Sequence, residues 1–142
     1  MLELIESENR YLTLETGGSL FAIPISDIKA IVTGTQAIRH TVLPHMPDCI
    51  KCVAMVDGQL TTIITFPGDK ANVHMLGRPI VILAYPKRTI GVLANRVDLI
   101  AIPEESISVD RVTRTRTYVK DSNIFFIVDI KDLLRDEEYS SL

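Results

Sequence analysis

The chain has 142 residues, of which 46% are hydrophobic and 23% are charged, and its formal net charge is −3. This length suits one domain, or two small subdomains that share a core, and it is sufficient for a core without disulfide staples. The slight acidity excludes the basic surface with which proteins bind nucleic acid. No apolar run approaches the roughly 18 residues of a membrane-spanning helix, so we expect no direct membrane insertion.

The N-terminal sequence MLELIESENR contains acidic residues and lacks the basic start and apolar stretch of a signal peptide. We therefore expect a cytoplasmic protein. Cys49 and Cys52 are then expected to be free thiols, because disulfides are rare in a reducing compartment.

Short apolar, β-branched runs separated by turn residues cover most of the chain. In chain order they predict strands at residues 11–16, 19–25, 50–56, 60–66, 80–85, 90–94, 97–102 and 124–130. After the second of these, Ser26 and Asp27 could cap one helical turn, or the chain could continue extended. Residues 33–49 contain glycine and proline breakers and are expected to be irregular. Short strands at this spacing favour a β-barrel or β-sandwich over a parallel sheet.

The C-terminal residues 129–138 predict the one helix of the chain. Asp129 is a suitable N-cap, and Ile130, Leu133 and Leu134 would lie on one helix face. In the strands, period-2 alternation predicts a set of buried apolar residues. These are Ile23, Ile28, Val53, Ile63, Val92, Val97, Ile127 and Val128.

Two pairs of segments resemble each other within the chain. DGQLTTIITF at 57–66 has the same kind of turn and apolar run as DSNIFFIVDI at 121–130, and AIPISDIKAI at 22–31 matches GVLANRVDLI at 91–100. The offsets of 64 and 69 residues are similar, and the order of the segments is kept. This pattern indicates one all-β unit used twice, although identities are few and any two strand–turn–strand segments share some features. A duplication would make the seam between the halves the natural place for function.

Residue patterns for catalysis are sparse. The chain has no nucleophile-bearing G-x-S-x-G turn and no glycine-rich phosphate loop. The one basic cluster, Arg111, Arg114, Arg116 and Lys120, lies among acidic residues and is expected to be a solvated loop. We therefore expect no enzyme and no cofactor.

A thiol or zinc site is the main chemical alternative. Cys49 and Cys52, together with His40 and His45, supply four residues of the types that bind zinc tetrahedrally. Cys49 and Cys52, however, run into a strand pattern, in which residues three apart point to opposite faces. A redox dithiol instead needs a helix N-terminus to lower the thiol pKa. Small buried hydrophobes are the simpler interpretation of these cysteines.

Five motifs in sequence resemble the CheW family of bacterial chemotaxis coupling proteins, over residues 9–135. The family's L-P-x-x-P-x-x-I-K-G-V-x-N-L-R-G is similar to LPHMPDCIKCV at 43–53 followed by MVDG at 55–58. Its Y-A-I-P-V-x-x-V is similar to FAIPISDI at 21–28, and its V-G-L-V-V-D-x-V to IGVLANRV at 90–97. Residues 102–107 and the closing segment 130–134 also agree.

The resemblance implies an all-β fold of two SH3-like five-stranded barrels packed together, with one short C-terminal helix. It implies a single domain over residues 1–142, which we divide into subdomains at 17–68 and at 1–16 with 78–142. It also implies a non-catalytic adaptor that links the cytoplasmic tips of methyl-accepting chemotaxis receptors to the regulatory domain of the histidine kinase CheA. That regulatory domain is itself a relative, so similar barrels would pair.

Position in the family motifs implies a receptor-binding groove between the barrels. Its expected residues are Ile28, Ile31, Cys52, Asp57 and Gly91. Core packing is the alternative role for the two isoleucines, and a simple turn position is the alternative for Asp57. We expect Gly91→Asp to abolish receptor-tip binding in a protein that still folds.

Departures from the family pattern concern the same residues. Asp57 stands where the family has arginine, which reverses a charge associated with receptor coupling, and Cys52 replaces a glycine. Ala94 and Asn95 replace the V-D of the second half. Either the partner has changed with these residues, or the chain is a divergent CheW-like module that serves another histidine-kinase pathway.

Overall fold

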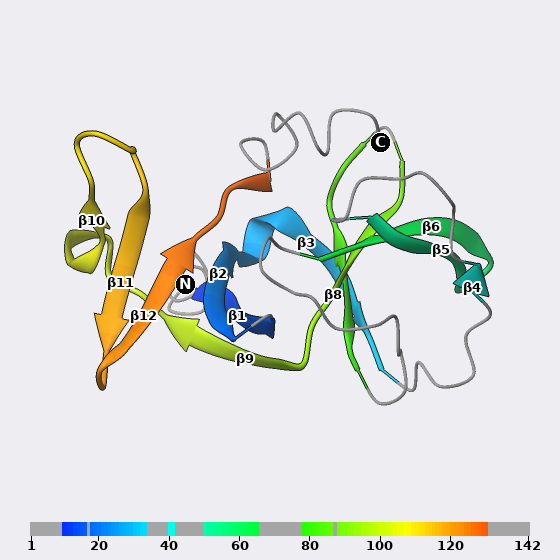
Figure 1. Cartoon of the computed structure of the whole chain (residues 1–142), viewed down its shortest axis with the longest axis horizontal. Coiled ribbons are helices and arrows are strands. Elements are labelled where there is room, and N and C mark those ends of the chain that lie inside the picture. Colours follow the sequence, from blue (N-terminus) through cyan, green and yellow to red (C-terminus); the bar gives the residue numbers. More distant parts are fainter. Residues whose placement is uncertain are drawn as a thin grey trace, which may run out of the picture.

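The computed structural model describes residues 10–16, 18–33, 40–41, 50–65, 78–86 and 88–130, and they form an all-β fold. Figure 1 shows β10, β11 and β12 at one end of the molecule and β4, β5 and β6 at the other. The expected fold class is confirmed. Within the described residues, no helix is long and apolar enough to span a bilayer.

The strands form two six-stranded sheets. Sheet A has the order β10-β11-β12-β2-β1-β9 and consists of β1 (Arg10–Thr16), β2 (Ser19–Pro24), β9 (Arg96–Ala101), β10 (Ser108–Val109), β11 (Arg116–Lys120) and β12 (Asn123–Ile127). Sheet B has the order β3-β7-β8-β6-β5-β4 and consists of β3 (Ile28–Val32), β4 (His40–Thr41), β5 (Ile50–Val56), β6 (Gln59–Ile64), β7 (Ile80–Leu83) and β8 (Ile90–Leu93). The edge strands β4 and β10 have only two residues each, so five longer strands remain in each sheet.

Helical structure is limited to short segments in the described part. The 3₁₀ turns η1 (Ile25–Asp27) and η3 (Glu104–Ser106) each have three residues. Ser26 and Asp27 lie inside η1 and do not cap a following helical turn. The next residues, Ile28–Val32, are extended, so the extended alternative is correct for them. The helix predicted over residues 129–138 lies outside the described residues, except for Asp129 and the helical Ile130.

The sequence duplication is present in the strand pairing. In sheet A, β12 runs parallel to β2 and Phe126 pairs with Phe21. In sheet B, β6 runs parallel to β8 and Thr62 pairs with Ile90. These two pairs are related by the same offsets of 64 and 69 residues that relate the matched segments. Each half therefore uses the same architecture in the same register.

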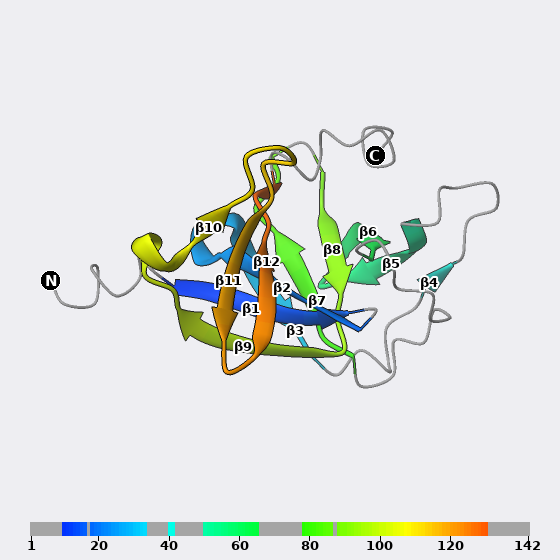
Figure 2. The same cartoon turned by 60° about the vertical axis from the view of Figure 1, so that its left-hand side comes forward.

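The two halves exchange their first hairpins. The β1–β2 hairpin pairs with β9 and β12, and the β7–β8 hairpin pairs with β3 and β6. The chain crosses between the sheets within the matched segments 22–31 and 91–100, as Figure 2 shows from a second side. One backbone hydrogen bond holds each crossing: the Ala84 N–H donates to the Asp27 carbonyl (2.8 Å), and the Asn95 N–H donates to the Glu15 carbonyl (2.8 Å).

The sheets do not follow continuous segments of the chain. Residues of β2 fall within 17–68 and lie in sheet A, and residues of β7 and β8 fall within 78–142 and lie in sheet B. The whole-chain domain and its division into subdomains at 17–68 and at 1–16 with 78–142 remain expectations.

Two apolar clusters hold the sheets. The first lies between the sheets and includes Leu12, Leu14, Ile23, Ile64, Val81, Leu83, Ile90 and Val92. The second belongs to sheet B and consists of Cys52, Ala54, Val56, Ile63, Ile80, Ile82 and Leu93. Side chains of β7 alternate between the clusters, which explains why this strand is apolar and buried throughout.

Three of the eight residues that the sequence predicted to be buried are fully buried, and the other five are not. Ile23, Ile63 and Val92 are fully buried. Five others are only half-buried: Ile28, Val53, Val97, Ile127 and Val128. Val53 lies between the buried Cys52 and Ala54 and so points to the opposite face of β5. Ile28 is the first residue of β3 and Val97 the second residue of β9, and both are edge strands, where one side lacks a neighbouring strand.

Candidate partner-binding site

A small cavity lies where β3 meets the β5–β6 turn. It has a volume of about 170 Å³, and we call it the β3 cavity. Its lining residues are Lys29, Ala30, Val56, Asp57, Gln59, Thr61, Ile82 and Thr89. Val56 and Ile82 are buried members of the sheet B core and give the cavity an apolar base. The rest of its lining is mainly polar.

Asp57 occupies the first central position of the β5–β6 turn. Asp57 and Gly58 both have positive φ, at 49° and 78°. This is the signature of a type I′ hairpin, which matches the right-handed twist of the strands and favours Asp-Gly. The turn leaves the Asp57 side chain exposed at the cavity. The expected turn is thus present, and the carboxylate is available to a partner.

The remaining polar lining residues are held by local hydrogen bonds. The Thr89 hydroxyl donates to Gln59 Oε1 (3.0 Å), and the Thr61 hydroxyl donates to the Gln59 carbonyl (3.2 Å). Lys29 is exposed on β3, and neither Lys29 nor Asp57 forms a hydrogen bond or ion pair with another described residue. The cavity therefore contains two opposite charges without a partner in the described part of the chain.

Ile28 and Ile31 lie on the same edge strand as Lys29. Ile31 is 41% exposed, whereas Ile28 is half-buried and packs against the core between the sheets. Ile31 can therefore contact a partner directly, and Ile28 mainly supports the strand.

Cys52 and Gly91 are buried inside sheet B. They belong to one cross-strand row, because Ile63 pairs with Cys52 on one side and with Gly91 on the other. Burial raises the pKa of the Cys52 thiol to about 11. Both residues can influence a partner only through the packing of the sheet.

Gly91 is needed for close packing. A Cβ atom there would lie 2.5 Å from Ile80 Cγ2 and 3.3 Å from the Cδ1 atoms of Ile63 and Ile82. Even alanine would therefore force the sheet B core to shift. This geometry reverses the expectation that Gly91→Asp remains folded: a charged side chain here should unfold the protein.

The zinc or thiol alternative receives little support from Cys52. Its raised pKa favours the neutral thiol, whereas metal binding and nucleophilic chemistry need the thiolate. In the described part of the chain, no group of three metal-ligating side chains occurs. Cys49 and His45 lie outside the described residues, and only the backbone of His40 is described.

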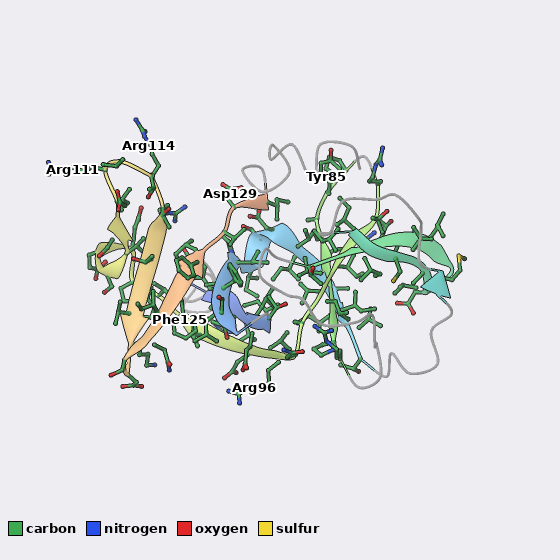
Figure 3. All side chains as sticks on the ribbon, in the orientation of Figure 1. Tyr85, Arg96, Arg111, Arg114, Phe125 and Asp129 are labelled. Carbon is green, nitrogen blue, oxygen red and sulfur yellow. The ribbon has the colours of Figure 1, made fainter. Side chains whose placement is uncertain are left out.

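The basic cluster lies away from the cavity. Arg111 and Arg114 lie in the β10–β11 loop, and Figure 3 shows both side chains pointing outward at the β10–β11 end of the molecule. The Asp110 carboxylate accepts hydrogen bonds from the Val112 N–H (2.8 Å) and the Thr113 N–H (3.2 Å), which orders the loop and lowers the pKa of Asp110. Arg111 and Arg114 are exposed, as expected for a solvated loop, whereas Arg116 and Lys120 are the two ends of strand β11 and Arg116 is half-buried.

Sequence reasoning missed Lys29, Thr61 and Thr89 as members of the site. Lys29 and Thr89 belong to segments far from the β5–β6 turn in sequence, and only the curvature of sheet B brings them together at one cavity. Lys29 could have been suspected because it is the one charged residue between Ile28 and Ile31.

Comparison with known proteins identifies the family. The CheW-like domain matches residues 10–138 of the chain. The scaffolding protein TtCheW from Thermoanaerobacter tengcongensis has a similar structure, with a TM-score of 0.68 and 18% identity over 84% of this chain and 88% of that one. No curated protein shows significant sequence similarity.

The match over most of its length shows that the chain belongs to the CheW-like family. This is the family of non-catalytic chemotaxis adaptors that the sequence motifs indicated. The likeness to TtCheW supports the fold alone, because the sequence identity is low.

Proposed function

We propose that this protein is a cytoplasmic adaptor that links chemoreceptor tips to the regulatory domain of the histidine kinase CheA. The observation that carries the proposal is the CheW-like domain over residues 10–138. The receptor tip would bind along β3 and the β5–β6 turn, where Ile31 and Asp57 are both exposed. Ile28, Cys52 and Gly91 would shape this surface from beneath.

The kinase needs a second surface, because an adaptor must hold both partners at once. The two equivalent hairpins each present an exposed apolar cross-strand pair: Met55 with Leu60, and Val119 with Ile124. Exposed apolar pairs on a sheet are suited to docking another β-domain. We assign the β5–β6 hairpin face, with Met55 and Leu60, to the kinase regulatory domain.

Two matched variants test this arrangement. Ile31→Glu places a charge on the receptor surface, and Leu60→Glu places the same charge on a hairpin face of the same sheet. We expect Ile31→Glu to weaken binding of a soluble receptor-tip fragment by about tenfold or more while kinase binding is unchanged, and Leu60→Glu to do the reverse. Calorimetric titration of both folded variants with both fragments measures this. If both variants bound both fragments like the wild type, these surfaces would be wrong.

A divergent module for another histidine-kinase pathway is the second candidate. Asp57 favours it, because a carboxylate stands where the family motif has arginine. Binding of wild-type protein to the receptor tip and kinase domain encoded beside its gene, compared with those of an unrelated histidine-kinase system, separates the two candidates. Selective binding to the unrelated system would support the second.

A further inference from the structure

The β3 cavity contains an acid and a base that are both exposed and both without partners among the described residues. Lys29 comes from β3 and Asp57 from the β5–β6 turn, yet they line the same volume of about 170 Å³. The neighbouring Gln59 and Thr89 already bond to each other. The charged groups left to bind a ligand are therefore one ammonium and one carboxylate, beside the remaining donors of the Gln59 amide.

These two groups define the chemistry of the occupant. An ammonium only donates hydrogen bonds, and a carboxylate only accepts them. The occupant must therefore offer one acceptor and one donor close together. A cationic group would be attracted by Asp57 but repelled by Lys29, and an anionic group would meet the reverse, so neither gains from both charges, whereas a neutral carboxamide can bond to both. Its alkyl stem would lie against Val56 and Ile82 at the apolar base.

We propose that the β3 cavity binds the carboxamide of an asparagine or glutamine side chain from the receptor-tip helix. The amide N–H donates to the Asp57 carboxylate, and the amide carbonyl accepts from the Lys29 ammonium. This inference rests on the proposed function and adds to it the residue type by which this chain selects its receptor. Lys29 and Asp57 together, and not Asp57 alone, determine that selection.

A charge exchange distinguishes a carboxamide from a charged group. Lys29→Asp alone leaves two carboxylates, and Asp57→Lys alone leaves two ammonium groups, so each single variant loses one hydrogen bond. In the double variant Lys29→Asp/Asp57→Lys, donor and acceptor only change places. A carboxamide can turn by about 180° about its last torsion and restore both bonds. A charged side chain has no such option.

The Asp57→Lys change also alters a turn residue with positive φ, and this effect has a matched control. Asp121 occupies the equivalent position of the β11–β12 turn, with φ of 52° against 49° at Asp57. It does not line the cavity. Asp121→Lys therefore carries the same backbone strain without changing the proposed site, and we expect it to bind like the wild type.

The experiment measures the affinity of each variant for a soluble helical fragment of the receptor tip, with every asparagine and glutamine of the tip replaced by alanine in turn. We expect each single charge variant to bind about tenfold more weakly, because hydrogen bonds to charged groups are lost. The double variant should recover most of this loss. One amide-to-alanine change in the tip should weaken wild-type binding at least as much, because both hydrogen bonds are lost, and should weaken binding of Lys29→Asp by less, because only the bond to Asp57 remains there.

Three results would overturn the inference. The first is a double variant that binds the tip no more tightly than the single variants. The second is a tip in which no amide-to-alanine change lowers the affinity. The third is a loss of affinity that results from replacing a charged tip residue instead of an amide. If the wild type binds the tip and all cavity variants bind equally, the cavity assignment fails and the proposed function stands. If the folded wild type does not bind the tip at all, the proposed function fails and the cavity assignment fails with it.

Discussion

Asp57 shows how one residue can serve both local structure and recognition. Its positive φ and the following glycine satisfy a type I′ turn, and this role was predictable from Asp-Gly between two apolar runs. Its position beside Lys29 was not predictable, because β3 is remote from the turn in the sequence. The turn fixes the backbone of Asp57, and the cavity leaves its carboxylate accessible to a binding partner.

Replacing Asp57 with arginine should exchange partner preference. We expect Asp57→Arg to weaken binding to the receptor tip encoded with this chain and to improve binding to a tip from an array whose coupling protein has arginine there. Asp57→Ala should have a smaller effect than Asp57→Arg, because it removes the carboxylate without placing a second cation beside Lys29. Affinities at low and high salt measure the effect, which salt should reduce.

Asp121→Arg is the control for backbone strain, because Asp121 occupies the equivalent turn position and also has a positive φ. Equal affinities of wild type and Asp57→Arg for both tips would mean that Asp57 is only a turn residue.

Cys52 should make stability depend on pH in the alkaline range. The folded-state pKa is about 11 against 9.0 for the ordinary thiol, so the unfolded chain releases this proton first as the pH rises. The thiol's contribution to stability is complete below pH 9.0 and decreases as the pH rises toward 11, by at most about 3 kcal/mol. Urea unfolding of wild type and Cys52→Ala across this range isolates the effect.

Because other groups also titrate at high pH, the difference between the two proteins is the informative quantity. The stability advantage of the wild type over Cys52→Ala should shrink with pH. Parallel curves would mean that the thiol is not buried in solution.

At the level of elements, hairpins were predictable and sheet neighbours were not. The β5–β6 and β11–β12 hairpins follow from local turn residues and adjacent apolar runs. The parallel pairing of β6 with β8 and of β12 with β2 joins segments far apart in the chain. Alternation along β8 predicts which of its residues share a face. The burial of Gly91 was not predictable in this way, because both faces of β8 are covered in the structure.

The equivalent residues Ile63 and Ile127 test this difference between the halves. They lie on β6 and β12, but Ile63 is fully buried and Ile127 only half-buried. Ile63→Ala should reduce the free energy of unfolding by about 2–5 kcal/mol, within the range for buried isoleucines. Ile127→Ala should cost clearly less, because fewer of its contacts are lost. Equal losses in denaturant unfolding would show that sheet A is packed as tightly as sheet B.

At the scale of the whole molecule, duplication and exchange agree with the proposed adaptor function. Each half contributes a hairpin to the other's sheet, and the core between the sheets joins residues from both. The repeated segments were visible in the sequence, but the exchange was not, because repeats do not say which copy a strand pairs with. The result is two similar β-faces and an edge strand with a cavity, which together can hold more than one partner.

The central claim is that the chain holds a receptor tip and a kinase regulatory domain at the same time. The direct measurement is the mass, by size-exclusion chromatography with light scattering, of mixtures of the chain with the soluble tip fragment, the isolated kinase domain, or both. We predict binary complexes in the first two mixtures and a ternary complex in the third, which Ile31→Glu reduces to the kinase binary complex. A folded chain that binds neither fragment, or binds them only in competition, would contradict the adaptor role.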